Sequence, residues 1–372
     1  MVDSLLQGGA ERSLLDLAHE MRNRGIVTTL ATLRDEPVGF SAENLGIERI
    51  RIQGSTAFGR MTNLRSHLQT GRFDLVHTML FASDITGRLA AWGTGIPVLS
   101  SIVNTTYDPE RLADPHVSAW KVGLIRQVDG WTARHLTRRL HAISEEVRDS
   151  AKRALGVPNS HIVVIPRGRD PDTFTPPSID VGNAIRQGMG LVAQAPVFLM
   201  LGRQEYQKGH ATLLEAWPTV LAALPNAVLL LAGRPGNESK RLAAITNRLK
   251  IIDTVRFLGF RQDVANLLAV ADVFVFPSRY EGLGGALLEA MAAQVPVVVT
   301  DLAVTREVLG NDAWFFPAGD VAALARELIA ASESSDDAIP AAALGRFMER
   351  FTLEAVGSQM AALYRDIVDT AS

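Results

Sequence analysis

The stretch of sequence that decides the fold is residues 277–291, Pro277-Ser278-Arg279-Tyr280-Glu281-Gly282-Leu283-Gly284-Gly285-Ala286-Leu287-Leu288-Glu289-Ala290-Met291. It places two glutamates eight positions apart across a glycine-rich turn. The apolar run at residues 272–276 predicts a buried strand before the turn, and the residues from Leu287 onward predict a helix after it. The start of a helix binds anions, because its backbone N–H groups lack partners and carry about half a positive charge. The stretch therefore predicts a strand, turn and helix that hold a diphosphate.

Short apolar runs alternate with helix-length segments along the whole chain. Buried strands separated by helices are typical of parallel sheets, so the pattern predicts an α/β fold with two doubly wound domains. The 372 residues, 47% of them hydrophobic, exceed what a single core usually holds. The predicted strands lie at residues 27–33, 75–78, 98–102, 140–143 and 162–165, and then at 197–201, 228–231, 255–257, 273–276, 295–299 and 314–316.

Domain boundaries follow from the same pattern. Pro176-Pro177-Ser178 separates the two series of strands and is typical of a linker. We expect an N-terminal domain at residues 1–177 and a second domain at 178–346, which the family resemblance described below implies to be the acceptor-side and the nucleotide-sugar-binding domain. A terminal helix, from Phe347 to Val368, is expected within residues 347–372.

Composition excludes several classes of protein. The net charge of −3 offers no broad electrostatic attraction for nucleic acid, and no nucleic-acid partner is expected. The absence of cysteine removes disulfides and suits a reducing cytoplasm. The apolar runs are of strand length, well below the ~20 residues that span a bilayer.

A basic region at residues 111–155 has two interpretations. It contains nine Lys and Arg against five Asp and Glu, together with Trp120 and Trp131. It could contact an anionic membrane surface or a lipid-linked acceptor, which would place the protein peripherally at the inner face of the cell membrane. Alternatively, it is a solvated helix face whose tryptophans belong to the core.

Six motifs, in the right order and spacing, resemble those of the family-four retaining glycosyltransferases. The resemblance spans nearly the whole chain and implies the GT-B fold, in which two Rossmann-like domains face each other across a cleft and the last helix crosses back to the first domain. The motifs are Gly8-Gly9-Ala10-Glu11-Arg12, Ile165-Pro166-Arg167-Gly168-Arg169-Asp170 with Phe174, Leu201-Gly202-Arg203 with Lys208-Gly209, Leu231-Ala232-Gly233, residues 271–278, and the E-x7-E pair Glu281 and Glu289.

Glycosyl transfer from a nucleoside diphosphate requires cations and oriented amides at the departing diphosphate. Arg203 and Lys208 follow strand 197–201. The Arg203 guanidinium can donate two hydrogen bonds to a phosphate at once, and the Lys208 ammonium can supply a compact positive charge. The resemblance implies that Glu289 binds the ribose, that Glu281 lies near the donor sugar, and that retention needs no protein nucleophile. The predicted catalytic residues are Arg203, Lys208 and Glu281, and the predicted donor-binding set adds Gly8, Gly9, Asn104, Phe260, Arg261, Gly282, Leu283, Gly284 and Glu289.

Neither a cofactor nor a metal is expected. The histidines show no paired spacing typical of a metal site. Asp170-Pro171-Asp172 matches a metal–sugar motif of a different transferase fold, but its place near the linker favours a turn. The expected partners are a nucleoside-diphosphate sugar and a glycan or lipid-linked acceptor.

Four departures from the family pattern matter for function. Asn104 stands where many relatives carry a histidine, and an asparagine cannot carry a proton or a positive charge. Arg167 replaces the usual asparagine, and Ala286 the usual proline. The resemblance also implies an apolar strand before Gly8, where only about seven residues precede it, so we expect an incomplete first strand.

Two other classes of function stay open on the sequence. One is a nucleotide-sugar epimerase or hydrolase with the same fold, which the pair of Glu281 and Glu289 with Lys208-Gly209 disfavours. The other is a catalytically silent subunit of a polysaccharide assembly complex, which Asn104 would suit. A glycosidase is disfavoured because its two carboxylates would flank a phosphate-binding turn.

Overall fold

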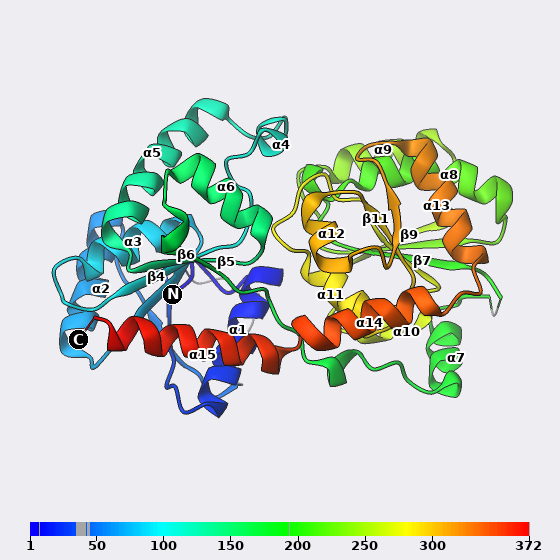
Figure 1. The fold of residues 1–372 in the computed structure, drawn as a ribbon. Coiled ribbons are helices and arrows are strands. Elements are labelled where there is room, and N and C mark those ends of the chain that lie inside the picture. Colours follow the sequence, from blue (N-terminus) through cyan, green and yellow to red (C-terminus); the bar gives the residue numbers. More distant parts are fainter. Residues whose placement is uncertain (7, 35–41, 43–44, 193, 372) are drawn as a thin grey trace. The chain divides into compact units, whose positions relative to one another are not determined.

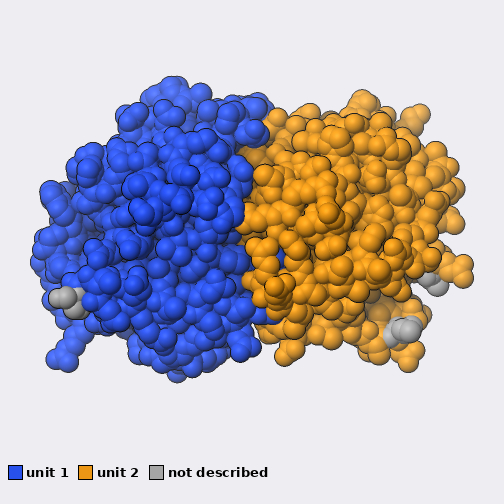
Figure 2. All heavy atoms as spheres, viewed as in Figure 1, with its two compact units in different colours: residues 1–169, 351–372 blue, residues 170–350 orange. Residues whose placement is uncertain are grey.

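The computed structural model describes residues 1–6, 8–34, 42, 45–192 and 194–371. These residues form two compact units (Figure 2). Unit 1 comprises residues 1–169 and 351–372, and unit 2 comprises residues 170–350. Each unit has its own sheet and core, which confirms the predicted α/β fold with parallel sheets.

Unit 2 contains a six-stranded parallel sheet in the order β12-β11-β10-β7-β8-β9. Four of its strands are almost continuous runs dominated by Val, Leu and Phe, because both faces of the sheet are covered by helices (Figure 1). Phe198 and Trp217 pack edge to face in its core, with ring centroids 5.2 Å apart. The strands are β7 (Val197–Leu201), β8 (Val228–Ala232), β9 (Val255–Gly259), β10 (Val273–Phe276), β11 (Val297–Thr300) and β12 (Trp314–Phe316).

Helices α8 to α13 each follow a strand of unit 2, whereas α7 precedes the first strand and α14 follows α13 directly. Helices α8 and α13 pack together on one face of the sheet. The helices are α7 (Ile179–Gly188), α8 (His210–Ala223), α9 (Ser239–Arg248), α10 (Val264–Val270), α11 (Gly285–Ala292), α12 (Ala303–Leu309), α13 (Val321–Glu333) and α14 (Ala338–Arg350).

Unit 1 has a parallel sheet in two parts, β3-β4-β5-β6 and β1-β2. Val2 bridges them, since it pairs in parallel with Thr32 of β1 and with Met79 of β3. The Val2 N–H donates to the Ala31 carbonyl over 3.0 Å, and the Met79 N–H donates to the Met1 carbonyl over 3.1 Å. The strands are β1 (Thr29–Thr32), β2 (Glu48–Arg51), β3 (Val76–Met79), β4 (Val98–Ile102), β5 (Arg139–Ala142) and β6 (Ile162–Val164).

The helices of unit 1 include one from the end of the chain. Helix α15 (Leu353–Asp369) packs on α1 (Gly9–Asn23), more than 300 positions earlier in the sequence. The remaining helices are α2 (Ala57–Thr70), α3 (Phe81–Ala91), α4 (Pro109–Leu112), α5 (Ala119–Leu136) and α6 (Glu145–Leu155). No helix among the described residues is both long and apolar enough to cross a bilayer.

The prediction of one terminal helix from Phe347 to Val368 is wrong. Helix α14 ends at Arg350, and α15 begins at Leu353. Thr352 has extended backbone and caps α15, because its hydroxyl accepts from the Ala355 N–H over 3.2 Å. The Arg169 N–H donates to the Phe351 carbonyl over 2.9 Å, and the Leu353 N–H donates to the Arg169 carbonyl over 2.8 Å. The units divide at residues 169/170 and 350/351 rather than after residues 177 and 346.

Candidate active site

The order of strands in unit 2 reverses between β7 and β10. From this pair, β8 and β9 extend to one side and β11 and β12 to the other. Loops at the carboxyl ends of such a pair run in opposite directions and leave a crevice, where open α/β sheets bind ligands. Arg203 follows β7 and the turn at residues 277–284 follows β10, so the strand order brings together the two segments with the most chemistry in the sequence.

An ion pair between Lys208 and Glu281 lies at the centre of this region. The Ser278 hydroxyl donates to the same Glu281 oxygen over 2.8 Å, and Glu281 is only 7% exposed. The Lys208 ammonium also lies 5.6 Å from the centroid of the Phe276 ring. A buried carboxylate is costly unless it is paired and hydrogen-bonded, and Glu281 is both.

Neighbouring backbone segments pack around this pair too closely for side chains. A Cβ on Gly233 would lie 1.8 Å from the Gly202 carbonyl oxygen, and one on Gly209 would lie 1.9 Å from that of Pro277. Gly209 also has φ +73°, a conformation that other residues rarely adopt. These glycines therefore let the ends of β7, β8 and β10 meet.

The predicted glycine turn leads into α11. Gly284, at φ +93°, is the N-cap of this helix, which begins two residues earlier than Leu287, where we expected it. Glu289 is buried one turn into α11, whereas Glu281 lies in the turn itself. Gly282, Leu283 and Gly284 thus occupy the segment between a strand end and a helix N-terminus, as the anion-binding prediction requires.

The remaining predicted residues of unit 2 lie nearby along the same sheet edge. Arg203 is exposed. Phe260 and Arg261 follow β9. The side chain of Asp263, at the N-cap of α10, makes no capping hydrogen bond; instead, it accepts from the Arg261 Nε over 2.7 Å and from its Nη2. Asp263 thereby holds the Arg261 guanidinium in a bidentate pair, and the pKa of Asp263 is lowered chiefly by that hydrogen bond.

Unit 1 carries the other three predicted donor residues. Gly8 is the N-cap of α1 and Gly9 its first residue. A Cβ on Gly8 would lie 2.4 Å from the Glu11 carboxylate, whereas one on Gly9 would meet nothing within 4 Å. Asn104 follows β4, and its side-chain oxygen accepts from the Thr105 N–H over 2.9 Å.

A buried hydrogen-bonded chain crosses the sheet of unit 1. His77 contacts the Tyr364 hydroxyl and the Ser101 hydroxyl, each over 2.6 Å, and Ser101 contacts His141 over 2.7 Å. Burial lowers the pKa of His141 to about 4 and that of His77 well below its usual value, so both imidazoles are neutral at pH 7. His77 is therefore a buried histidine whose two ring nitrogens both have hydrogen-bond partners.

His210 is a residue that the sequence analysis missed. It begins α8 and is buried, and burial, followed by the charge of Lys208, lowers its pKa to about 3. The sequence feature that could have pointed to His210 is its position directly after Lys208-Gly209. No cluster of metal-binding side chains occurs in the part of the chain that the structure describes.

Comparison with known proteins agrees with this arrangement. The family model described as "Glycosyl transferase 4-like domain" matches residues 8–168, and the one described as "Glycosyl transferases group 1" matches residues 195–334. The two matches fall on units 1 and 2 respectively.

Three known proteins illustrate the relationship. A phosphatidyl-myo-inositol mannosyltransferase of Mycobacterium tuberculosis is 30% identical over 392 residues, which cover 98% of this chain and 95% of that protein. An Escherichia coli UDP-Gal:alpha-D-GlcNAc-diphosphoundecaprenol alpha-1,3-galactosyltransferase is 28% identical over 244 residues, 65% of this chain and 61% of that protein. Anabaena HepE, solved in complex with UDP and glucose, is 22% identical with a TM-score of 0.85, and the match covers 97% of each chain.

The likeness to the mycobacterial enzyme extends over nearly both full lengths, and the fold of both units matches a solved member of the same architecture. This chain belongs to the family-four glycosyltransferases and has the GT-B fold.

Proposed function

We propose that this protein is a retaining glycosyltransferase that moves a hexosyl group from a nucleoside-diphosphate sugar to a glycan or lipid-linked acceptor. The observation that carries the proposal is the Lys208–Glu281 pair, set among the glycine-rich ends of β7, β8 and β10. A cation held beside amide-rich turns suits an anionic leaving group, whose charge grows as the bond to the sugar breaks.

In this reaction the bond from the anomeric carbon to the diphosphate oxygen breaks, and a bond from the same carbon to the acceptor oxygen forms. Lys208 and Arg203 stabilise the departing diphosphate. The diphosphate itself accepts the proton that the acceptor hydroxyl loses, so the step balances without a nucleophile from the protein. Glu281 already accepts hydrogen bonds from Lys208 and Ser278. Its role is therefore to position the Lys208 ammonium and to accept hydrogen bonds from hydroxyl groups of the donor sugar.

The names of two relatives support the proposed acceptor class. The full-length mycobacterial relative is named for mannosyl transfer to phosphatidyl-myo-inositol, and the Escherichia coli relative for galactosyl transfer to a diphosphoundecaprenol-linked sugar. Both acceptors are lipid-linked. We infer a role in synthesis of cell-envelope polysaccharide or glycolipid, with the enzyme in the cytoplasm.

Thermal stabilisation by candidate donors tests the proposal most directly. A ligand at 100 times its dissociation constant is expected to add about 2.7 kcal/mol to the free energy of unfolding of the unit that binds it. Calorimetric scans with UDP-, GDP- and ADP-sugars should therefore show a shifted transition for at least one nucleotide. A positive donor would then be incubated with membrane extracts to detect sugar transfer. Donor hydrolysis without transfer to any acceptor would favour a hydrolase, and no donor binding at all would favour the silent subunit.

Transfer is expected to persist in saturating chelator, because cations and amides of the protein suffice to hold the diphosphate. Asp170→Asn is expected to be mild for the same reason. One Asp170 oxygen accepts from the Asp172 N–H over 3.0 Å and the other from the Thr173 hydroxyl over 3.1 Å, which is turn chemistry. Activity that chelator abolishes and manganese or magnesium restores would contradict this prediction.

A further inference from the structure

Helix α5 (Ala119–Leu136) exposes a row of large apolar side chains. Trp120 is 71% exposed, Leu124 63%, Val128 43% and Trp131 48%. With 3.6 residues per turn, these four positions fall within an arc of about 80° on the helix surface. They form one stripe, which we call the α5 stripe, and contiguous exposed apolar surface of this kind is typical of an interaction site.

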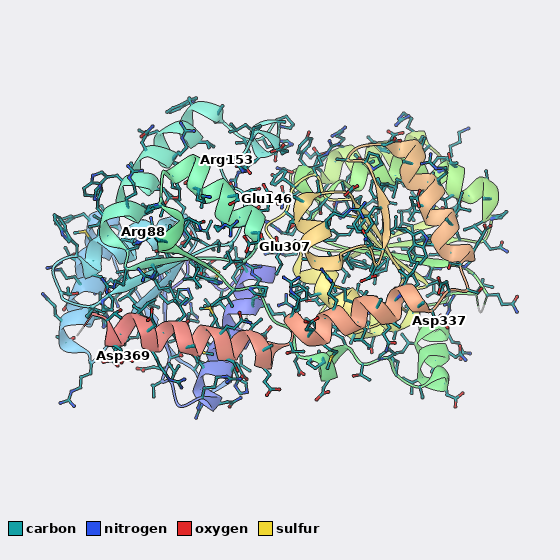
Figure 3. The ribbon with its side chains drawn as sticks, viewed as in Figure 1. Arg88, Glu146, Arg153, Glu307, Asp337 and Asp369 are labelled. Atoms are coloured by element: carbon teal, nitrogen blue, oxygen red, sulfur yellow. The ribbon has the colours of Figure 1, made fainter. Side chains whose placement is uncertain are left out.

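The stripe faces away from the body of unit 1 for a definite reason. Asp129, on the opposite side of the helix, accepts a 2.6 Å hydrogen bond from Arg88 of α3. Thr132 on the same side also accepts from Arg88, over 2.9 Å. Arg88 lies in the interior, and α5 lies at the rim of unit 1 beside α3 and α6 (Figures 1 and 3). The buried polar contact therefore fixes the rotation of the helix, and the tryptophans are left in solvent rather than in the core.

Positive charge surrounds the stripe. From Arg111 to Arg139 the chain has six Lys and Arg and only two Asp, and both of these, Asp114 and Asp129, are buried. Lys121 and Arg134 lie just beyond the two edges of the stripe by the same helical geometry. Neither forms an ion pair with any residue that the structure describes, although Arg134 donates to the Leu155 carbonyl and Lys121 lies 5.7 Å from the Trp120 ring. The exposed surface of α5 thus combines apolar side chains with cations and no carboxylate.

The rest of the basic region behaves differently. On α6, Arg148 pairs with Glu145 and Asp149, and Arg153 pairs with Glu146 and Asp108, each of the last two over 3.3 Å. Arg153 and Glu146 lie together on one side of α6 in Figure 3. These charges neutralise one another, so the excess positive charge of residues 111–155 belongs to α5 and its flanks.

We propose that the α5 stripe docks on the surface of an anionic lipid bilayer, with Trp120, Leu124, Val128 and Trp131 inserted at the headgroup level and Lys121 and Arg134 near the phosphates. Tryptophan side chains favour this interfacial region, and a helix with an apolar face and flanking cations lies in its plane. Charge decides the occupant: an acid-free, cation-flanked stripe complements an anionic surface, whereas a second copy of the same stripe would bring like charges together. The inference rests on the proposed function only in that it would bring the enzyme to lipid-linked acceptors; the docking itself needs no donor.

The test is co-sedimentation of the full chain with two kinds of vesicle. One is made of phosphatidylcholine alone, and the other contains about 30% phosphatidylglycerol, which makes its surface strongly anionic. We expect binding to the anionic vesicles only, weakening as salt rises. Trp120→Ser with Trp131→Ser should lower the affinity at least ~10-fold, since each loses a large apolar contact. Phe58→Ser on α2 is the matched control, because Phe58 is also 71% exposed and should leave binding unchanged.

A charge pair of variants separates electrostatics from folding. Lys121→Gln should weaken binding about fivefold, which corresponds to about 1 kcal/mol for one cation at an anionic surface. Arg126→Gln, an exposed residue on the side of α5 away from the stripe, should change binding less than twofold. Bromine-labelled lipids should quench the fluorescence of Trp120 and Trp131. The quenching of these two residues is the difference between the quenching of the unchanged protein and that of the double tryptophan variant.

Three outcomes would overturn the proposal: equal binding to neutral and anionic vesicles, no binding to either, or a dimer in sedimentation velocity that the tryptophan variants abolish. The last would show that a second copy covers the stripe. None of these measurements includes a sugar donor, so their failure leaves the donor-induced thermal shift, and with it the proposed function, unaffected.

Discussion

Lys208→Ala is expected to lower the turnover number at least ~100-fold, because removing one preorganised donor to the developing charge typically costs ~10²–10³ in rate. The ammonium of Lys208 is held by Glu281 in the site, with its stem against Gly202, so it needs little reorganisation to meet a diphosphate. The measurement is the steady-state rate with a donor identified by thermal stabilisation. The loss should fall mainly on kcat rather than on KM, since the interaction strengthens as the bond breaks.

Loss of folding would imitate this result. In Lys208→Ala the buried Glu281 keeps, of the two hydrogen-bond donors described above, only Ser278. Arg203→Ala avoids the difficulty: Arg203 is exposed, so its removal should leave the melting temperature unchanged while it also lowers turnover at least ~100-fold. Lys240→Ala, at an exposed position of α9 in the same unit, is the matched control and should retain full activity. Near-wild-type rates in both site variants would falsify the assignment of a phosphate clamp.

Asp129→Ala is expected to destabilise unit 1 by about 3–5 kcal/mol, because it leaves the Arg88 guanidinium buried without its carboxylate. The Arg88 side chain is only 1% exposed, and its remaining partners are uncharged: the hydroxyls of Thr132 at 2.9 Å and Ser100 at 3.0 Å, and the backbone carbonyl of residue 129 at 3.4 Å. Asp129 also accepts from the Tyr107 hydroxyl over 2.6 Å. For a unit of this size the loss corresponds to roughly 6–20 °C in melting temperature, measured by calorimetry on the full chain.

An exposed pair of the same chemistry provides the comparison. Asp301 accepts a bidentate pair from Arg306 over 2.7 and 2.9 Å, but its side chain is 45% exposed and that of Arg306 40% exposed. Asp301→Ala should therefore cost at most about 1 kcal/mol. Arg88→Met combined with Asp129→Ala should recover much of the lost stability, since the guanidinium and its carboxylate partner are both removed. A double variant as unstable as Asp129→Ala alone would show that packing, and not the buried charge, sets the cost.

Several elements could be predicted closely from the sequence, because their local pattern and their environment agree. The strands at residues 197–201, 273–276 and 314–316 have the predicted bounds. Each is a run of apolar residues short enough for a strand; the first two are fully buried in the observed sheet and the third is partly buried, so burial and periodicity specify the same conformation. The glycine turn before α11 was predictable for a similar reason, since a φ of +93° at Gly284 is accessible to glycine and rarely to other residues.

Elements whose conformation depends on partners could not be found in this way. Strand β2, with sequence Glu48-Arg49-Ile50-Arg51, is largely polar and forms because it pairs with β1. The break at Phe351 and Thr352 follows from their pairing with Arg169, which is far away in sequence.

The sequence by itself determined which residues follow the strands, and hence the family and the two α/β units, because strand, turn and helix preferences act over a few residues. Only the tertiary structure decided which of those residues meet. The pairing of Lys208 with Glu281, 73 positions apart, depends on β7 lying beside β10. The exposure of Trp120 and Trp131 depends on Arg88 of another helix binding Asp129 and so fixing the rotation of α5. Both are long-range contacts, whose partners are set by strand order and helix packing and leave no local pattern in the chain.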